Sequence, residues 1–275
     1  MTSGNKTDTV REETSAPGRA LDTKFAGELL DSIGRLLGRF VSPEGLTVDY
    51  RGLEACDDYH AYLEKSLDLA RLDPAILESR EQKLAFWINI YNMTVIDCVV
   101  RRSINDSVLE NKGFFNHDAV QIGNHKYSLD DIENGILNGN VRRQYRPLRQ
   151  FRIWDARNRL TVEPAHECVC FAMVRGSKSS PLLHFYQEEK IEAQLYAAAT
   201  GFINGGGAVL NHETKTLSIS RIFKWHAPDF GGGQGVMKFI ANHFRSTEDA
   251  AFLRSNAASL KVNYQSYDRN LNISA

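Results

Sequence analysis

A tight turn in the middle of the chain holds residues with the means to do chemistry. Ser180 stands before a proline in the segment GSKSSPLL (Gly176 to Leu183), and Lys178 lies two residues earlier. A serine hydroxyl activated by a lysine base is a known nucleophile in acyl-transfer enzymes. Turn serines before proline also have a purely local use, because their hydroxyls bond nearby backbone groups. Both interpretations of Ser180 are open from the sequence.

Cys170 is the second candidate nucleophile. It lies in CVCFAMV (Cys168 to Val174), an apolar run that predicts a buried central strand. A cysteine becomes reactive only where a base or a positive charge stabilises its thiolate. No such group adjoins Cys170 in the sequence, although His166 and His184 flank the region. The alternatives are inert core packing and a nucleophile whose base is brought close by the fold.

Several residues could bind a substrate. Arg175 and Lys178, together with the backbone amides of residues 176–180, would suit a carboxylate or phosphate, although a solvated turn has the same composition. Trp225 and His226 stand side by side near Asp229, and a histidine oriented by a carboxylate can act as a base or as a structural residue.

The histidines and cysteines lack the spacings of metal sites, and no cofactor motif is present, so we expect neither metal nor cofactor.

Two further sets of polar residues fall on predicted helices. The segment Arg80 to Arg102 is apolar on most of its circumference, which predicts a buried central helix. Asn89 and Asn92 project from neighbouring positions on it, and because an unpaired buried polar group costs about 1–3 kcal/mol, we expect them to join a specific hydrogen-bond network. Glu133 belongs to the acidic segment that follows Ser128; this cluster is explained either by a helix start or by a site.

The remaining pattern predicts a single α+β domain in which helices surround a small, mainly antiparallel sheet, in a papain-like or transglutaminase-like arrangement. Residues 1–22 have the composition of a solvated tail, 23–80 form a helical region packed on the main domain, and 81–275 form the core. Further helices are predicted at 25–40, 57–71, 129–137, 187–202 and 236–244, and the last of these is expected to be the final helix. Strands are predicted at 119–122, 151–154, 160–162, 168–174, 208–210 and 216–219.

Composition limits the partners. The 275 residues are 42% apolar and 24% charged, which is ordinary for a soluble globular protein. A formal net charge of -1 offers no long-range attraction to a polyanion, so we expect neither nucleic acid nor a membrane as a partner. The N-terminus lacks the apolar stretch of a secretory signal, and a cytoplasmic location is expected. No motif reports the oligomeric state.

The order of the motifs resembles that of a known family. FWINIYN (Phe86 to Asn92), YSLDDIENGIL (Tyr127 to Leu137), LSISRIFKWHAPDF (Leu217 to Phe230) and YDRNLN (Tyr267 to Asn272) are similar to signatures of the domain of unknown function 547 family. The likeness runs from about Leu84 to Asn272. This family has no firmly assigned general activity, so the resemblance implies a fold more than a function.

The chain departs from the family pattern where that pattern has its most reactive side chains. The family motif RIHFAL-x-C-x-x-x-SCPPL corresponds here to CVCFAMVRGSKSSPLL, which places Cys170 at the histidine position and Arg175 and Ser180 at the two cysteine positions. Asn134 stands where the second motif usually has histidine, and Arg269 where the last usually has tryptophan. A catalytic Cys and His set in relatives would therefore be lost or rearranged in this chain.

Two hypotheses follow. In the first, the protein is a divergent hydrolase or acyl transferase acting on amide, peptide-like or thioester substrates. In the second, it is a non-catalytic module that binds a small anionic ligand or peptide, which would make it a pseudoenzyme. The catalytic hypothesis uses Ser180 or Cys170 as nucleophile with Asn89, Asn92 and Glu133 orienting the site; the binding residues are Arg175, Lys178, Trp225 and His226.

Overall fold

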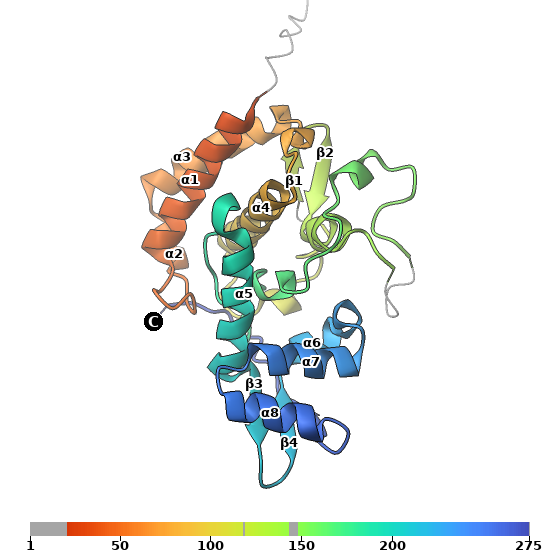
Figure 1. Cartoon of the computed structure of the whole chain (residues 1–275). Helices are drawn as coiled ribbons and strands as arrows, with labels where there is room; N and C mark the ends of the chain where they lie inside the picture. The colour runs from red at the N-terminus through yellow and green to blue at the C-terminus, as the bar shows by residue number, and fades with distance from the viewer. Residues whose placement is uncertain (1–20, 118, 143–147, 275) are drawn as a thin grey trace, which may run out of the picture.

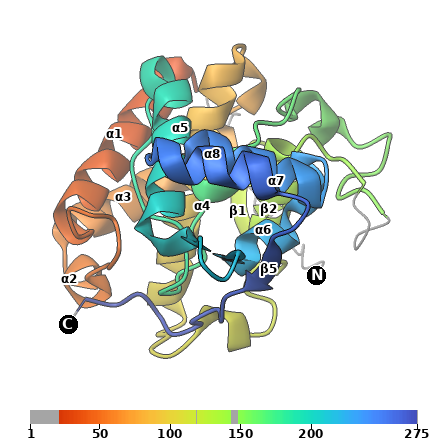
Figure 2. The same cartoon turned by 60° about the horizontal axis from the view of Figure 1, so that its bottom comes forward.

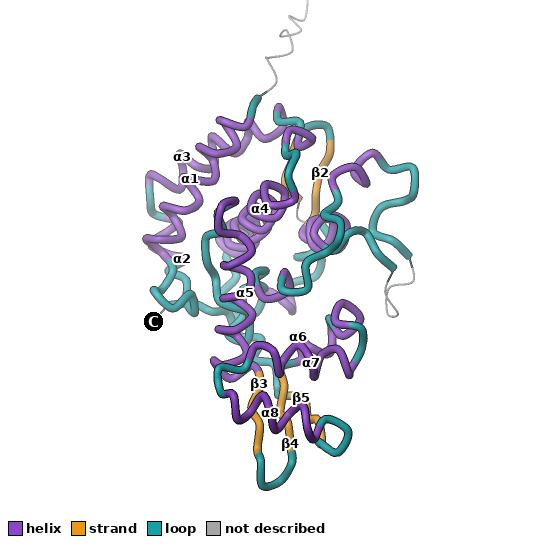
Figure 3. The backbone as a smooth tube through the Cα atoms, viewed as in Figure 1, coloured by secondary structure: helices purple, strands orange, loops and turns teal. Residues whose placement is uncertain are grey.

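The computed structural model describes residues 21–117, 119–142 and 148–274 (Figure 1). Nearly all of the predicted tail, residues 1–20, lies outside the described residues. The described part is an α+β domain of many helices and two small sheets, as the sequence predicts (Figure 3). The papain-like or transglutaminase-like arrangement stays a prediction.

Three N-terminal helices pack along the central helix (Figure 1). They are α1 (Thr23–Phe40), α2 (Tyr50–Glu54) and α3 (Asp57–Leu67), and the central helix is α4 (Arg80–Arg101). The predicted apolar stripe of α1 is confirmed, because it is buried. Asp22 begins this helix by accepting a hydrogen bond from the Phe25 amide.

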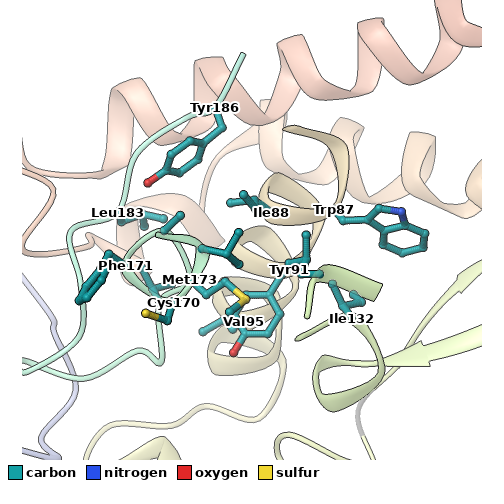
Figure 4. Packing of buried hydrophobic residues seen from close by; sticks show 14 of the residues in the cluster. Trp87, Ile88, Tyr91, Val95, Ile132, Cys170, Phe171, Met173, Leu183 and Tyr186 are labelled. Carbon is teal, nitrogen blue, oxygen red and sulfur yellow. The ribbon is translucent and has the colours of Figure 1, made fainter. Parts of the chain in front are cut away.

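Helix α4 is the core of the molecule, as predicted. A capping box between Ser79 and Gln82 fixes its start, and every residue from Leu84 to Ile96 is buried. By length and composition it is the one helix among the described residues that could cross a membrane, but 83% of its most apolar window is buried inside the protein. Figure 4 shows its side chains, including Ile88, Tyr91 and Val95, packed against the segment that carries Phe171.

The second half of the chain carries the sheets. Strands β1 (Ala119–Ile122) and β2 (His125–Ser128) form an antiparallel hairpin, and β3 (Ala208–Asn211) pairs with β4 (Thr216–Ile219) as predicted. The sequence missed β5 (Lys261–Tyr264), which adds to β4 in parallel. Four helices accompany these strands: α5 (Ile191–Phe202), α6 (Arg221–Trp225), α7 (Gly233–His243) and α8 (Thr247–Asn256). Figure 2 shows α7 and α8 side by side in front of α5. The final helix is α8, and the prediction that the helix at 236–244 would be the last is wrong.

Three predicted strands are wrong. Residues 168–174 contain the 3-10 helix η6 (Val169–Phe171), while 151–154 and 160–162 are turns and the end of the 3-10 helix η5 (Ala156–Leu160). The apolar run was buried as expected, but its backbone is satisfied by a side chain: Asn92 Nδ2 donates to the Ala172 carbonyl over 2.9 Å, and its Oδ1 accepts from the Val174 amide over 3.0 Å. A side-chain amide thus replaces the neighbouring strand.

An aromatic cluster joins the C-terminal elements to this segment. The Phe171 ring lies 5.3 to 5.6 Å from the rings of Phe202, Phe223 and Phe239, which come from α5, α6 and α7. Such tilted and stacked pairs contribute beyond simple burial. The cluster therefore fixes α6, and the residues that follow it, relative to α4.

Candidate functional site

An open pocket of about 830 Å³ lies where the sequence motifs converge. Its walls come from segments far apart in the chain: the π-helix η4 (Asp131–Leu137), the loop after η6, helix α6 and the segment near the C-terminus. The pocket is lined by Leu109, Asp130, Glu133, Asn134, Arg175, Arg221, Trp225, His226, Ser266, Tyr267 and Arg269.

A buried ion pair forms the floor of this pocket. Arg175 Nη2 donates to Glu133 Oε1 over 2.6 Å, and the two side chains are 20% and 5% exposed. Burial works against the charged guanidinium, but Glu133 and then Tyr91 outweigh it, so the pKa of Arg175 lies above its usual value. Arg175 is therefore a permanent cation that is already partly neutralised by Glu133.

Tyr91 and His226 extend the ion pair into a network. Tyr91 Oη donates to Glu133 Oε2 over 3.4 Å, and burial, followed by the Glu133 charge, raises the pKa of Tyr91 well above its usual value. His226 Nδ1 lies 3.0 Å from Asp229 Oδ2, and Nε2 lies 3.8 Å from Glu133 Oε1. A row of charged and titratable groups thus runs from Asp229 through His226 and Glu133 to Arg175.

The start of η4 explains how Glu133 is aimed. Ser128 Oγ accepts from the Asp131 amide, and Asp131 Oδ2 accepts from the Ser128 amide, each over 3.1 Å. The helix is wound widely, with the Asn138 amide donating to the Glu133 carbonyl over 3.0 Å, a form common at functional sites. The acidic cluster is therefore divided: Asp131 caps the helix, while Asp130 and Glu133 line the pocket.

The side chains of the two asparagines of α4 form hydrogen bonds with the backbone of other segments and do not line the pocket. Asn89 Nδ2 donates to the Tyr186 carbonyl over 2.7 Å, and its Oδ1 accepts from the Tyr186 amide over 3.0 Å. Asn92 forms the same pair of hydrogen bonds with the backbone on either side of Met173. Because Val174 directly precedes Arg175, Asn92 helps to set where the guanidinium enters the pocket.

Ser180 closes the turn in which it lies. Its Oγ accepts from the amides of Arg175 and Ser177 over 3.0 and 3.1 Å. The amides of Lys178 and Ser179 donate to carbonyl groups near the C-terminus, so they are not directed at a ligand. Ser180 and Lys178 border a separate pocket of about 380 Å³, and the structure does not bring them together with Glu133 and His226.

Cys170 lies in the core on η6, next to Phe171 (Figure 4). Its Sγ lies 3.8 Å from the Glu167 carbonyl, and its side chain does not line the pocket. Nearby, burial and then the Glu167 charge raise the pKa of Cys168 to about 12. All four cysteines are buried and none forms a disulfide.

Probe labelling tests these placements. We expect neither a fluorophosphonate probe at Ser180 nor iodoacetamide at Cys170 to label the native protein at pH 8, because the hydroxyl is held by two amides and the thiol is buried. Unfolding should expose all four cysteines to iodoacetamide. Mass spectrometry of native and denatured samples is the measurement. Fast native labelling that Ser180→Ala or Cys170→Ala abolishes would establish a nucleophile and contradict this expectation.

Several lining residues were missed as site residues by sequence reasoning. Asp130 sits beside the predicted Glu133, Arg221 precedes the predicted Trp225, and Tyr267 and Arg269 belong to the YDRNLN motif. Their membership in these motifs was the available signal. Ser266 carried no signal.

Among the described residues, no group of three or more His, Cys, Asp or Glu side chains gathers as a metal site would require.

Comparison with known proteins gives a family match over part of the chain. The model described as "Protein of unknown function, DUF547" matches residues 76–203, so this segment of the chain belongs to that family. The match covers α4, η4, Arg175 and α5, whereas α6 and the C-terminal wall of the pocket follow it. No curated protein and no solved structure matches the chain.

Three of the five departures from the family pattern meet in this pocket, whereas Cys170 and Ser180 lie outside it. Asn134, Arg175 and Arg269 all line it, in place of the histidine, cysteine and tryptophan that the resemblance leads one to expect. Two of these three residues add a guanidinium. At these two positions the chain therefore carries a group that binds anions.

Proposed function

We propose that this family member is a binding module whose pocket holds a small ligand or peptide through an anionic group such as a carboxylate. The observation that carries the proposal is that three arginines, Arg175, Arg221 and Arg269, line one pocket. Guanidinium groups bind carboxylates through paired charge-assisted hydrogen bonds. Arg221 and Arg269 are exposed, so their approach to a ligand requires little rearrangement.

The balance of charge supports an anion. The lining contains three arginines against the two carboxylates of Asp130 and Glu133, which leaves a positive excess before His226 is considered. The pocket volume of about 830 Å³ lies in the range of small-molecule sites, about 300–1,000 Å³. Trp225, whose ring lies 5.0 Å from that of Tyr267, offers an aromatic wall for an apolar part of the ligand.

Hydrolysis is the second candidate, and the pairing of His226 with Asp229 favours it. A histidine oriented by a carboxylate at 3.0 Å could activate water as a general base. With Ser180 and Cys170 outside the pocket, the attacking group would be water or the exposed Ser266. His226→Ala would then abolish hydrolysis of an ester or amide panel, while a binding module would show no hydrolysis to abolish.

Calorimetric titration tests the binding proposal. The probe is an N-acetylated tripeptide that ends in a free carboxylate, compared with the same peptide as a C-terminal amide. We expect only the free carboxylate to bind, and Arg269→Ala or Arg221→Ala to weaken it by about tenfold each, as the loss of a charge-assisted hydrogen bond implies.

Lys178→Ala is the matched control, because Lys178 is an exposed cation that borders the separate pocket. Its affinity for the peptide should equal that of the unmodified protein. Equal binding of the carboxylate and amide peptides, or equal weakening by all three substitutions, would remove the arginines from ligand recognition and with them the proposal.

A further inference from the structure

A short turn at residues 152–155 carries two large exposed apolar side chains. Ile153 and Trp154 are 82% and 76% exposed. They occupy the central positions of a turn closed by the Asp155 amide, which donates to the Arg152 carbonyl over 2.9 Å. Turn centres usually hold Gly, Pro, Asn, Asp or Ser, so local backbone demands do not explain an Ile-Trp pair.

The turn is firmly anchored on both sides. Phe151 is fully buried, and its amide and carbonyl are both bonded by the side chain of Asn140, over 2.9 and 3.0 Å. On the other side, the Asp155 carboxylate binds the Arg157 guanidinium over 2.9 Å. The fold therefore presents Ile153 and Trp154 to solvent in a defined geometry.

Arg149 and Arg152 are the charged side chains among residues 148–154. The sequence from Val141 to Trp154 contains five arginines and no acidic residue. The Arg152 guanidinium lies 5.7 Å from the centre of the Trp154 ring. We define the arginine-tryptophan patch as the exposed residues Leu148, Arg149, Arg152, Ile153 and Trp154; Leu148 is 78% exposed.

We propose that the arginine-tryptophan patch binds the surface of an anionic lipid bilayer. Leu148, Ile153 and Trp154 enter the interface between headgroups and acyl chains, where an indole ring is favoured. Arg149 and Arg152 remain at the level of the phosphates. The net charge of -1 for the whole chain does not oppose this, because a charge is felt only within about 8 Å at physiological salt.

The composition of the patch favours a bilayer over other polyanionic partners. Of the three apolar side chains only Trp154 can stack on a base, so the aliphatic Leu148 and Ile153 would gain little from nucleic acid. A standard protein interface uses about 20–30 residues on each side, whereas this patch is a short segment. A bilayer needs only a few inserted side chains with cations beside them.

Tryptophan fluorescence provides the first readout. The full chain is mixed with phosphatidylcholine vesicles, either pure or containing phosphatidylserine. Trp154 is the exposed tryptophan, since Trp87 is fully buried and Trp225 is partly buried. We expect a blue shift with the anionic vesicles that weakens as salt rises, and none with soluble glycerophosphoserine.

Vesicle sedimentation with variants provides the second readout. Ile153→Ser with Trp154→Ser should lower partitioning by at least about tenfold, and Arg149→Gln with Arg152→Gln by about tenfold or more. Leu148→Ser should weaken binding, while the matched control Leu67→Ser, on an α3 residue that is 77% exposed, should not. Failure to bind anionic vesicles, equal binding by the Ile153/Trp154 variant, or preference for a single-stranded oligonucleotide over vesicles would each overturn the proposal.

Discussion

Replacing Asn92 by alanine is expected to lower the free energy of unfolding by about 3–5 kcal/mol, because a buried donor and acceptor each lose a partner worth about 1–3 kcal/mol and a small cavity is added. The side chain is fully buried and bonds both the Ala172 carbonyl and the Val174 amide. Because Ala172 and Val174 are 0% and 2% exposed, bulk solvent does not supply a substitute partner. Urea unfolding, compared at a constant slope, measures the change.

Asn105 supplies the control for this substitution. It is exposed, and its amide donates to the nearby Ser103 carbonyl. Asn105→Ala should change the free energy of unfolding by no more than about 0.5 kcal/mol. A loss below about 1 kcal/mol for Asn92→Ala would show that the backbone from Ala172 to Val174 finds other partners, and that the side-chain amide does not stand in for a strand.

The same asparagine shows what the sequence could and could not predict. Its place in an apolar helix correctly predicted a buried hydrogen-bond network, because the residues around it in the same helix indicate burial, and a buried amide needs hydrogen-bond partners. The partner could not be predicted, because an apolar run such as Cys168 to Val174 is compatible with a strand or with a 3-10 turn. Strand β5 was missed although its sequence, KVNY, alternates polar and apolar residues, because alternation over only four residues is a weak signal.

The site was predictable in composition more than in geometry. Glu133, Arg175, Trp225 and His226 were named from motifs, and the structure places them around one pocket. Ser180 and Lys178, named with them, border another pocket. The difference depends on long-range packing: the aromatic cluster of Phe171 brings α6 towards η4, and no local pattern encodes that approach.

The two residues of the ion pair on the pocket floor should differ in how much their removal lowers the free energy of unfolding. Arg175→Met leaves the Glu133 carboxylate, which is 5% exposed, without its cation, and should cost about 3–5 kcal/mol of unfolding free energy. Glu133→Gln should cost less, because Arg175 is 20% exposed and can turn towards water. The double variant should recover part of the loss, as replacement of both charges often does.

The Glu133→Gln substitution should also strengthen peptide binding while it weakens the fold. A unit charge about 10 Å away contributes about 1.7 kcal/mol at an effective dielectric constant of about 20, so removing this carboxylate should tighten binding of the free-carboxylate tripeptide by about tenfold. Glu248→Gln, an exposed substitution on α8, should leave binding unchanged and alter the free energy of unfolding by no more than about 0.5 kcal/mol. Calorimetry and urea unfolding on the same samples separate the two effects. Weaker binding by Glu133→Gln would show that the carboxylate supports the bound peptide, directly or by positioning Arg175, and would contradict the prediction that its charge opposes the anion.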